Sequence, residues 1–524
     1  MILFNIRKIF IAFFCFAFAV LGSSHAKAQN NNDELYFHRL LYKQTSFDYN
    51  SIVASDMIYS NNQEFSDIAI KYSGEYGTYH RPQTAKNQTG YIFDAQGCVI
   101  PSEKIYMGGG FHFSQNYKNS VRFNSLIDPY RGTPYQLADS TDSNWRIQNY
   151  SMWTKLATEI IDKKLSAGVF LSLNVARGAK MIDPRPKSNN NRIEAVPSLT
   201  LNLGKNRIGG AFVYERFNEL TNFILYNTSE TQKIYAFKGL GQYTFDIFST
   251  TERERRYDGH GIGGMISYRY RENNFEIDIQ GKYTNYGEEV SDIENNKPRL
   301  RGKYFSDKYF AIVDFKLYGD NFLNQIKIIP DINKESGKEI IQIYNSSENV
   351  NAWQTDSEAP NRWKGNKKNF KAVYSLKSLS SDKNYSPYGI EVGYQNKSFD
   401  EKYEVMDTYI NFKNNIISLS PEMNTLLGNH LLASFKLNGE YCIVTDFNAN
   451  YKEREEDNPT VKEMFFDKET DILSQNYYSL GGAASIGYSF DNGNSLIMNV
   501  DYKYLRTENG FYRHYPLISL SYNF

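Results

Sequence analysis

The sequence predicts an all-β fold, a transmembrane antiparallel up-and-down β-barrel, on three observations. Long segments alternate apolar and polar residues, short connections alternate with long polar ones, and aromatic residues are unusually frequent. Tyr, Phe and Trp make up 15% of the 524 residues, with 42 Tyr and 35 Phe. A transmembrane barrel explains all three, because its strands face lipid on one side and carry aromatic girdles at both membrane interfaces.

The alternation is clearest at the C-terminus, where Ile518, Leu520, Tyr522 and Phe524 are separated by single polar residues. A second example runs from Leu165 to Val175, with Leu171 on the apolar face and Ser172 on the polar face. Strands of a soluble sandwich average about 5–6 residues. Segments of ten residues or more match the roughly 9–11 residues of a tilted transmembrane strand.

Connection lengths give an independent indication of topology. Short turns such as Asp491-Asn492-Gly493 alternate with long polar segments at 118–146, 178–192, 332–366 and 447–475. Outer-membrane barrels have short periplasmic turns and long extracellular loops. We therefore predict about 18 strands, with 14–18 compatible with the boundaries. We assign the strand-like pieces within 219–256 to long strands that project above the membrane.

The N-terminal region predicts export. Arg7 and Lys8 precede an apolar run from Ile9 to Leu21, and Ala26-Lys27-Ala28 follows, as in a signal peptide. We expect a signal peptide at 1–28, an N-terminal segment at 29–65 and the barrel at 66–524. The segment 29–65 is interpreted either as a plug inside the lumen or as a disordered periplasmic tail. The predicted location is the outer membrane of a Gram-negative bacterium.

Composition and motifs argue against nucleic-acid binding and catalysis. Lys plus Arg and Asp plus Glu are both 59, so the chain has no basic excess for nucleic acid. No histidine pair has metal-ligand spacing, and no nucleophile lies in a recognisable motif, so we predict no metal, no cofactor and no enzymatic activity. Charged residues of both signs are expected in the lumen, among them Glu215, Arg269, Lys282, Lys316, Glu391, Lys436, Glu440, Asp501 and Lys503.

Four aromatic residues stand on segments predicted to be polar loops: Trp353, Trp363, Phe465 and Phe466. Aromatic side chains on a solvated loop favour a contact surface. The alternative is that they fold back over the mouth of the barrel. Either way, we expect these loops to form a gate or a docking surface.

The blocks Tyr91–Ala95 and Tyr106–Phe111, together with the terminal Phe524, resemble an uncharacterised outer-membrane β-barrel protein family of the Bacteroidota. The resemblance implies the fold and no substrate. The last strand also resembles the signal by which the barrel assembly machinery recognises its clients, carried by Ile518, Leu520, Tyr522 and Phe524.

These observations predict a channel or transporter for a small solute, surrounded by outer-membrane lipids. The alternative is a non-transporting subunit that docks a surface lipoprotein or a partner barrel through its loops. A barrel enzyme acting on lipid is the least favoured class. The sequence is compatible with an open or a plugged lumen, and with Cys98 and Cys442 either paired or unpaired.

Overall fold

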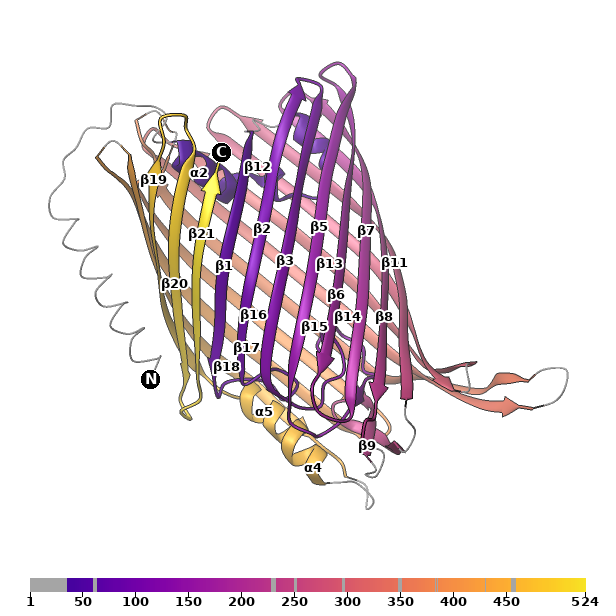
Figure 1. The fold of residues 1–524 in the computed structure, drawn as a ribbon. Helices are drawn as coiled ribbons and strands as arrows, with labels where there is room; N and C mark the ends of the chain where they lie inside the picture. Colours follow the sequence, from indigo (N-terminus) through magenta and orange to yellow (C-terminus); the bar gives the residue numbers. More distant parts are fainter. Residues whose placement is uncertain are drawn as a thin grey trace.

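The computed structural model is a closed antiparallel β-barrel of eighteen strands (Figure 1). Consecutive barrel strands are neighbours, and β1 (Phe65–Gly77) pairs both with β2 (Asn87–Ser102) and with β21 (Tyr512–Asn523). The prediction of an up-and-down barrel with about 18 strands is therefore confirmed. The structure describes residues 35–59, 64–227, 232–248, 252–294, 297–346, 351–381, 383, 385–428, 430–453 and 459–524.

The other barrel strands follow in chain order, each antiparallel to the next. They are β3 (Ile105–Val121), β5 (Ser143–Ile161), β6 (Leu165–Lys180), β7 (Arg185–Leu203), β8 (Asn206–Ile224), β11 (Glu252–Glu272), β12 (Phe275–Glu294), β13 (Lys297–Tyr318), β14 (Phe322–Asn345), β15 (Ala352–Ser378), β16 (Tyr388–Tyr403), β17 (Thr408–Leu427), β18 (Leu431–Asn450), β19 (Tyr477–Ser489) and β20 (Ser495–Thr507).

Two predicted loops are wrong. Residues 178–192 lie mostly in β6 and β7, and most of 332–366 lies in β14 and β15, which are 24 and 27 residues long. A strand needs an apolar face only where it crosses lipid. Beyond the membrane the same strand can be polar on both faces, which removes the alternation that sequence analysis depends on.

The assignment of 219–256 to projecting barrel strands is also wrong in its centre. β9 (Gln232–Gly239) and β10 (Gln242–Phe248) form a separate three-stranded sheet with the short β4 (Leu137–Ala138). Ile234 and Tyr235 are buried. This stretch therefore folds inward instead of continuing the wall.

The two ends of the barrel differ. We call the end that holds helix α2 and the C-terminus the terminal end, and the other the loop end, where α4, α5 and β9 lie (Figure 1). Turns at the terminal end are short, as at 162–164 and 204–205, whereas 122–142 and 451–476 connect strands at the loop end. Within the part of the chain that is described, no helix has the length and apolarity to cross a membrane.

The outward face of the barrel is apolar and bordered by aromatic residues. Ile266 is 69% exposed and Leu480 is 62% exposed. In a soluble protein, such exposure of large apolar side chains to water would be unfavourable. Near the terminal end the outward side chains include Phe275, Phe322, Tyr388, Phe490 and Phe524. Phe524 and Tyr522 also contact each other, with ring centroids 5.6 Å apart. This surface has the pattern of a lipid-facing band between two girdles.

The outward and inward faces can be distinguished by charge insertion. Leu171 points outward and is 41% exposed, whereas Ser172 lines the lumen. We expect Leu171→Arg to cost about 2–4 kcal/mol of folding free energy near the membrane midplane. Ser172→Arg is the matched control, because its guanidinium would remain in the polar lumen. The free energy of unfolding of both variants can be measured by urea titration in lipid vesicles. Equal values would contradict the assignment of the outward and inward faces.

Candidate functional site

The terminal end of the lumen is occupied by residues 35–59, which we call the plug. It comprises α2 (Leu35–Thr45), α3 (Phe47–Asn50) and the 3-10 helix η1 (Ala54–Tyr59). Ser46 caps α3 by accepting a hydrogen bond from the Tyr49 N–H, at 3.2 Å. The turn between α3 and η1 is fixed by the Ser51 hydroxyl, which accepts from the Val53 N–H.

Buried ion pairs attach the plug to the wall. The Asp48 carboxylate pairs with Arg207 on β8, at 3.3 Å, and with Arg269 on β11. Arg207 also donates to the carbonyl oxygens of Asp56 and Tyr59, at 2.8 and 3.0 Å. Because Asp48 and Arg207 are both at least nine-tenths buried, removal of either partner would leave an uncompensated charge in the lumen.

Further hydrogen bonds complete the attachment. The Asp56 carboxylate accepts from the hydroxyls of Thr200 and Ser267, at 2.7 and 2.9 Å. The Ser55 backbone N–H donates to Ser198, and Ser166 donates to the Ser55 carbonyl. Strands β6, β7, β8 and β11 therefore hold the plug through many polar contacts, and apolar contacts add to them where Val53, Met57 and Phe37 pack against the wall.

Close approach of the plug to β6 depends on a glycine. A Cβ built on Gly168 would lie 2.5 Å from the Ser55 backbone nitrogen and 2.8 Å from the Ala54 carbonyl carbon. Beside it, Val53 packs in a small apolar cluster with Phe170 and Val196. The wall is thus shaped to receive the backbone of η1.

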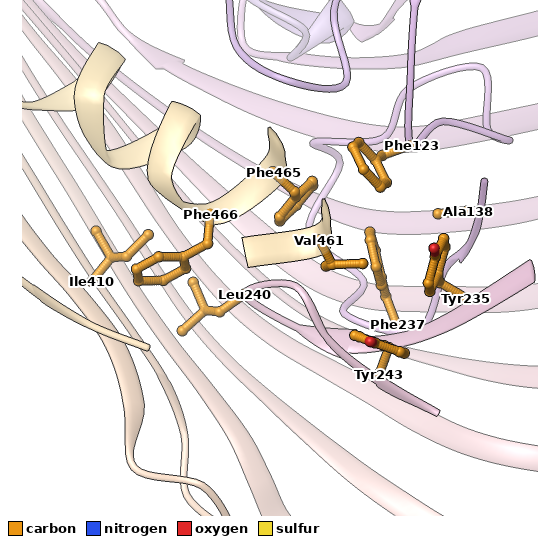
Figure 2. Packing of buried hydrophobic residues seen from close by; sticks show 10 residues of the cluster. All are labelled: Phe123, Ala138, Tyr235, Phe237, Leu240, Tyr243, Ile410, Val461, Phe465 and Phe466. Carbon is orange, nitrogen blue, oxygen red and sulfur yellow. The ribbon is translucent and has the colours of Figure 1, made fainter. Parts of the chain in front are cut away.

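The loop end is covered by four inward-folded segments, residues 78–86, 122–142, 232–248 and 459–473, which we call the cap. The last segment contains α4 (Pro459–Val461), the π-helix η2 (Lys462–Phe466) and α5 (Asp467–Leu473). Figure 2 shows how the last three of these segments meet in a buried apolar cluster. Its members are Phe123, Ala138, Tyr235, Phe237, Leu240, Tyr243, Ile410, Val461, Phe465 and Phe466.

The cap cluster includes a wall residue, Ile410 on β17, so it joins the cap to the barrel (Figure 2). A second junction lies at Gly239, where φ is 114°. A Cβ there would lie 2.2 Å from the Trp363 ring on β15. The β9–β10 turn is therefore seated directly on the wall.

Charged groups fasten the cap as well. Arg81 pairs with Glu469 on α5, with Nε 2.6 Å from Oε1, and its guanidinium stacks on Tyr130 at 3.5 Å from the ring centroid. Arg131 donates to Glu288 on β12 and lies 3.5 Å from Glu219 on β8. Since Arg81 and Glu469 belong to different cap segments, their ion pair is a latch between them.

The cap also holds a histidine in its neutral form. His80 Nε2 lies 3.1 Å from Lys468 Nζ, and its Nδ1 lies 3.0 Å from the Arg81 carbonyl oxygen. Burial, followed by the Lys468 charge, lowers the pKa of His80 from 6.5 to about 4. The closed cap therefore binds a proton at this ring more weakly than an exposed histidine would.

Several cavities remain in the lumen. One of about 520 Å³ lies at the terminal end beside Asp67 and Asp94, and one of about 650 Å³ lies beneath the cap. Several of the charged residues predicted to be lumenal form ion pairs between strands. Lys282 pairs with Glu194, Lys316 with Glu276, and Lys503 with Glu440.

The aromatic residues chosen from sequence are not on open loops. Trp363, Phe465 and Phe466 are buried, and Phe465 and Phe466 belong to the cap cluster. Trp353 lies on β15 and contacts Tyr344, with ring centroids 5.1 Å apart. Ile518, Leu520, Tyr522 and Phe524 all point outward from β21.

Sequence reasoning missed the residues that fasten the two closures, Asp48, Asp56, Arg81, Arg131 and Glu469. Their partners lie far away in sequence, and the segments that carry them have no periodicity. Among the described residues there is no cluster of three or more potential metal ligands. Cys98 and Cys442 are buried thiols on β2 and β18 and form no disulfide with each other.

Comparisons with known proteins identify a family and a set of barrels. The model of the Family of unknown function (DUF6850) matches residues 54–524. A search of curated proteins gave no match. Among solved structures, the chain is similar to the copper transporter OprC at 8% identity, TM-score 0.41, covering 85% of this chain and 62% of that one.

It is also similar to BauA, the ferric preacinetobactin receptor from Acinetobacter baumannii, at 8% identity and TM-score 0.38, covering 89% and 80% of the two chains. The RagAB peptide importer in its closed-closed state gives 8% identity and TM-score 0.38, covering 88% and 87%. The chain spans less than two thirds of the length of OprC.

The fit of the plug can be tested at Gly168. Gly168→Ala would push the η1 backbone from β6, which costs about 1–3 kcal/mol for an overpacked site. We expect faster proteolysis of residues 35–59 and a higher ion conductance. Gly210→Ala is the control, since a Cβ there meets nothing within 4 Å. Equal conductance of the two variants would contradict a tight plug-wall contact.

Closure of the cap should depend on pH through His80. Its pKa is about 4 in the closed cap and returns toward about 6.5 on exposure, so protons bind preferentially to the open cap. Lowering the pH from 7.5 to 5 should therefore increase opening, by roughly tenfold after allowance for partial exposure. Hydrogen exchange of residues 459–473 measures this. A His80→Gln variant with an unchanged pH dependence would contradict the role of His80.

Proposed function

The chain belongs to the Family of unknown function (DUF6850), and we propose that it is an outer-membrane transport protein that admits a small solute when its plug and cap are displaced. The observation that carries this proposal is the obstruction of the lumen at both ends by the chain's own segments. Barrels of 16–18 strands otherwise enclose an aqueous channel. A wide barrel filled in this way suits regulated passage better than free diffusion.

The chemistry of the plug contacts supports displacement. Asp48, Asp56 and Ser55 bind the wall through ion pairs and hydrogen bonds. Each polar contact contributes little net free energy, since water can replace it when the plug moves. The apolar contacts of Val53, Met57 and Phe37 with the wall add to the free energy needed to displace the plug, but each of these clusters is small. The plug is thus positioned firmly but can be released.

The cap can open in a similar way. Its apolar cluster is formed mainly among its own segments, with Ile410 the wall residue in the cluster (Figure 2). Charged pairs attach the cap to the wall, including Arg131 with Glu288 and Lys180 with Asp139. Tyr135 and Leu126 of the cap also pack against aromatic side chains of the wall. Such an arrangement lets the cap move while much of its own core stays intact.

A docking function is the second candidate, and one observation favours it. Ile341 and Ile343 on β14 are 53% and 59% exposed, in a region where β14 and β15 extend past the rim (Figure 1). Exposed apolar residues outside the lipid band suit contact with a surface lipoprotein or a second barrel. In that case the barrel would serve mainly as an anchor.

Conductance separates the two functions. Replacing residues 459–473 with a short Gly-Ser linker removes a cap segment and spares the pairing of β18 with β19. We expect the variant to assemble as a folded barrel and to conduct several-fold more ions in planar bilayers, with a further rise when combined with Gly168→Ala. Ile341→Ser/Ile343→Ser is the control and should leave conductance unchanged. If the cap-deleted and plug-displaced barrels conduct no better than the intact chain, transport is refuted and docking becomes the better explanation.

A further inference from the structure

The cavity beneath the cap has a roof of loop residues and a wall of strands. Tyr79, Arg81, Tyr130 and Arg131 line it from the cap, and strands β13 to β17 supply the opposite side. Its volume is about 650 Å³, within the roughly 300–1,000 Å³ of pockets that bind small molecules. A solute that had passed the cap would enter this chamber first.

Strand register places lysines and amides side by side on the chamber wall. Lys308 on β13 is opposite Asn333 on β14, which is opposite Lys367 on β15. In the adjacent row, Asp331 is opposite Asn369, which is opposite Lys397 on β16, and Lys397 is opposite Asn414 on β17. Directly opposed residues in a sheet point to the same face. All of these side chains therefore face the lumen.

Three cations of the chamber have ion-pair partners. Arg81 pairs with Glu469, Arg131 with Glu288, and Lys367 with Glu335 at 2.8 Å. These pairs hold the cap or join neighbouring strands. The charges in these pairs therefore have a structural role and need no ligand.

Lys308 and Lys397 are different. Among the described residues, neither ammonium has a carboxylate oxygen within 4.0 Å or a side-chain hydrogen bond. Lys308 instead lies over the Tyr286 ring, 5.3 Å from its centroid. Lys371, two residues beyond Asn369 on the same face of β15, is also exposed. Against these lysines the wall offers one acid without an ion pair, Asp331.

We propose that this chamber binds a small anionic organic solute, with carboxylate or phosphate groups held by Lys308 and Lys397. The inference deepens the proposed transport function and rests on it for access to the site. An ammonium binds such anions as a compact point charge with several donors. Unbalanced positive charge inside low-dielectric walls also concentrates anions from solution.

The other lining residues define the rest of the ligand. Asn333, Asn369 and Asn414 supply amide donors and acceptors, which suit hydroxyl groups. Phe399 and Phe412 add an apolar surface against which a ring or a carbon skeleton can pack. The expected solute is thus polar and organic, with an acidic group, rather than a bare inorganic ion.

Three sugars that share one scaffold test the charge requirement. Glucose is neutral, glucuronate carries a carboxylate and glucose 6-phosphate carries a phosphate. Isothermal titration of the full chain in detergent should give an affinity for at least one anionic sugar more than tenfold above that for glucose, and the difference should shrink with added salt. Comparison of the affinities for glucuronate and glucose 6-phosphate also shows whether the site prefers a carboxylate or a phosphate.

Access is controlled by repeating the titrations with Glu469→Gln, which weakens the latch and leaves both lysines in place. Lys308→Gln/Lys397→Gln should lower the anionic affinity at least tenfold. Lys334→Gln is the matched control, because Lys334 lies on the outward face of β14 near Tyr309 and should change nothing. Equal binding of all three sugars, no binding in either the intact or the Glu469→Gln chain, or an unaffected double variant would each overturn the proposal.

Failure of this inference is distinguishable from failure of the proposed function, because the titrations measure equilibrium binding and need no passage across a bilayer. Anion binding without conductance through the opened barrel would retain the site and refute transport. Conductance through the opened barrel without a preference for anionic sugars in the titrations would retain transport and refute the anion-binding site.

Discussion

Backbone hydrogen bonds between β1 and β21 close the sheet. Ser66 and Phe524 exchange both of their N–H···O bonds at 2.9 Å, and the register continues from Asp67 opposite Asn523 to Gly77 opposite Arg513. Without this seam, two strand edges would present unpaired N–H and C=O groups to hydrocarbon, at several kcal/mol for each group. Closure in turn requires each strand to separate an apolar outer face from a polar inner face. The outward Leu171 and the inward Ser172 follow from that requirement.

A ring of eighteen strands is too wide for wall side chains to fill. The chain fills it with its own segments, and the polar inner face then determines how those segments bind. Wall charges buried beneath the plug or cap need partners. Asp48 supplies one for Arg207 and Arg269, while Arg131 supplies one for Glu219 and Glu288. The same charged wall that keeps the lumen polar thereby positions both closures.

The strands could be predicted from sequence because the two-residue period is imposed locally by lipid on one side and water on the other. That signal ends where the membrane ends, so the sequence predicts a loop where the outer parts of β14 and β15 lie. The contacts of the closures had no local signal at all. Arg269 was predicted to face the lumen, yet its partner Asp48 is 221 residues away in a segment without periodicity. Trp363 and Phe465 were noticed for their chemistry, but their burial depends on how the cap folds back.

Ion pairing distinguishes charged residues that hold the structure together from charged residues that could bind a ligand. The plug forms polar contacts with strands β5 to β12 through groups such as Lys155, Ser166, Thr200 and Gln280. It also contacts Asp67 on β1 and Lys327 and Lys377 on β14 and β15. Charges in that part of the wall are matched by the plug or by neighbouring strands. On β13 to β16 beneath the cap, Lys308 and Lys397 face an open cavity. Two like charges on one wall gain nothing for the stability of the barrel, since they repel each other and order no segment. These two lysines are therefore available to an anion that enters from outside.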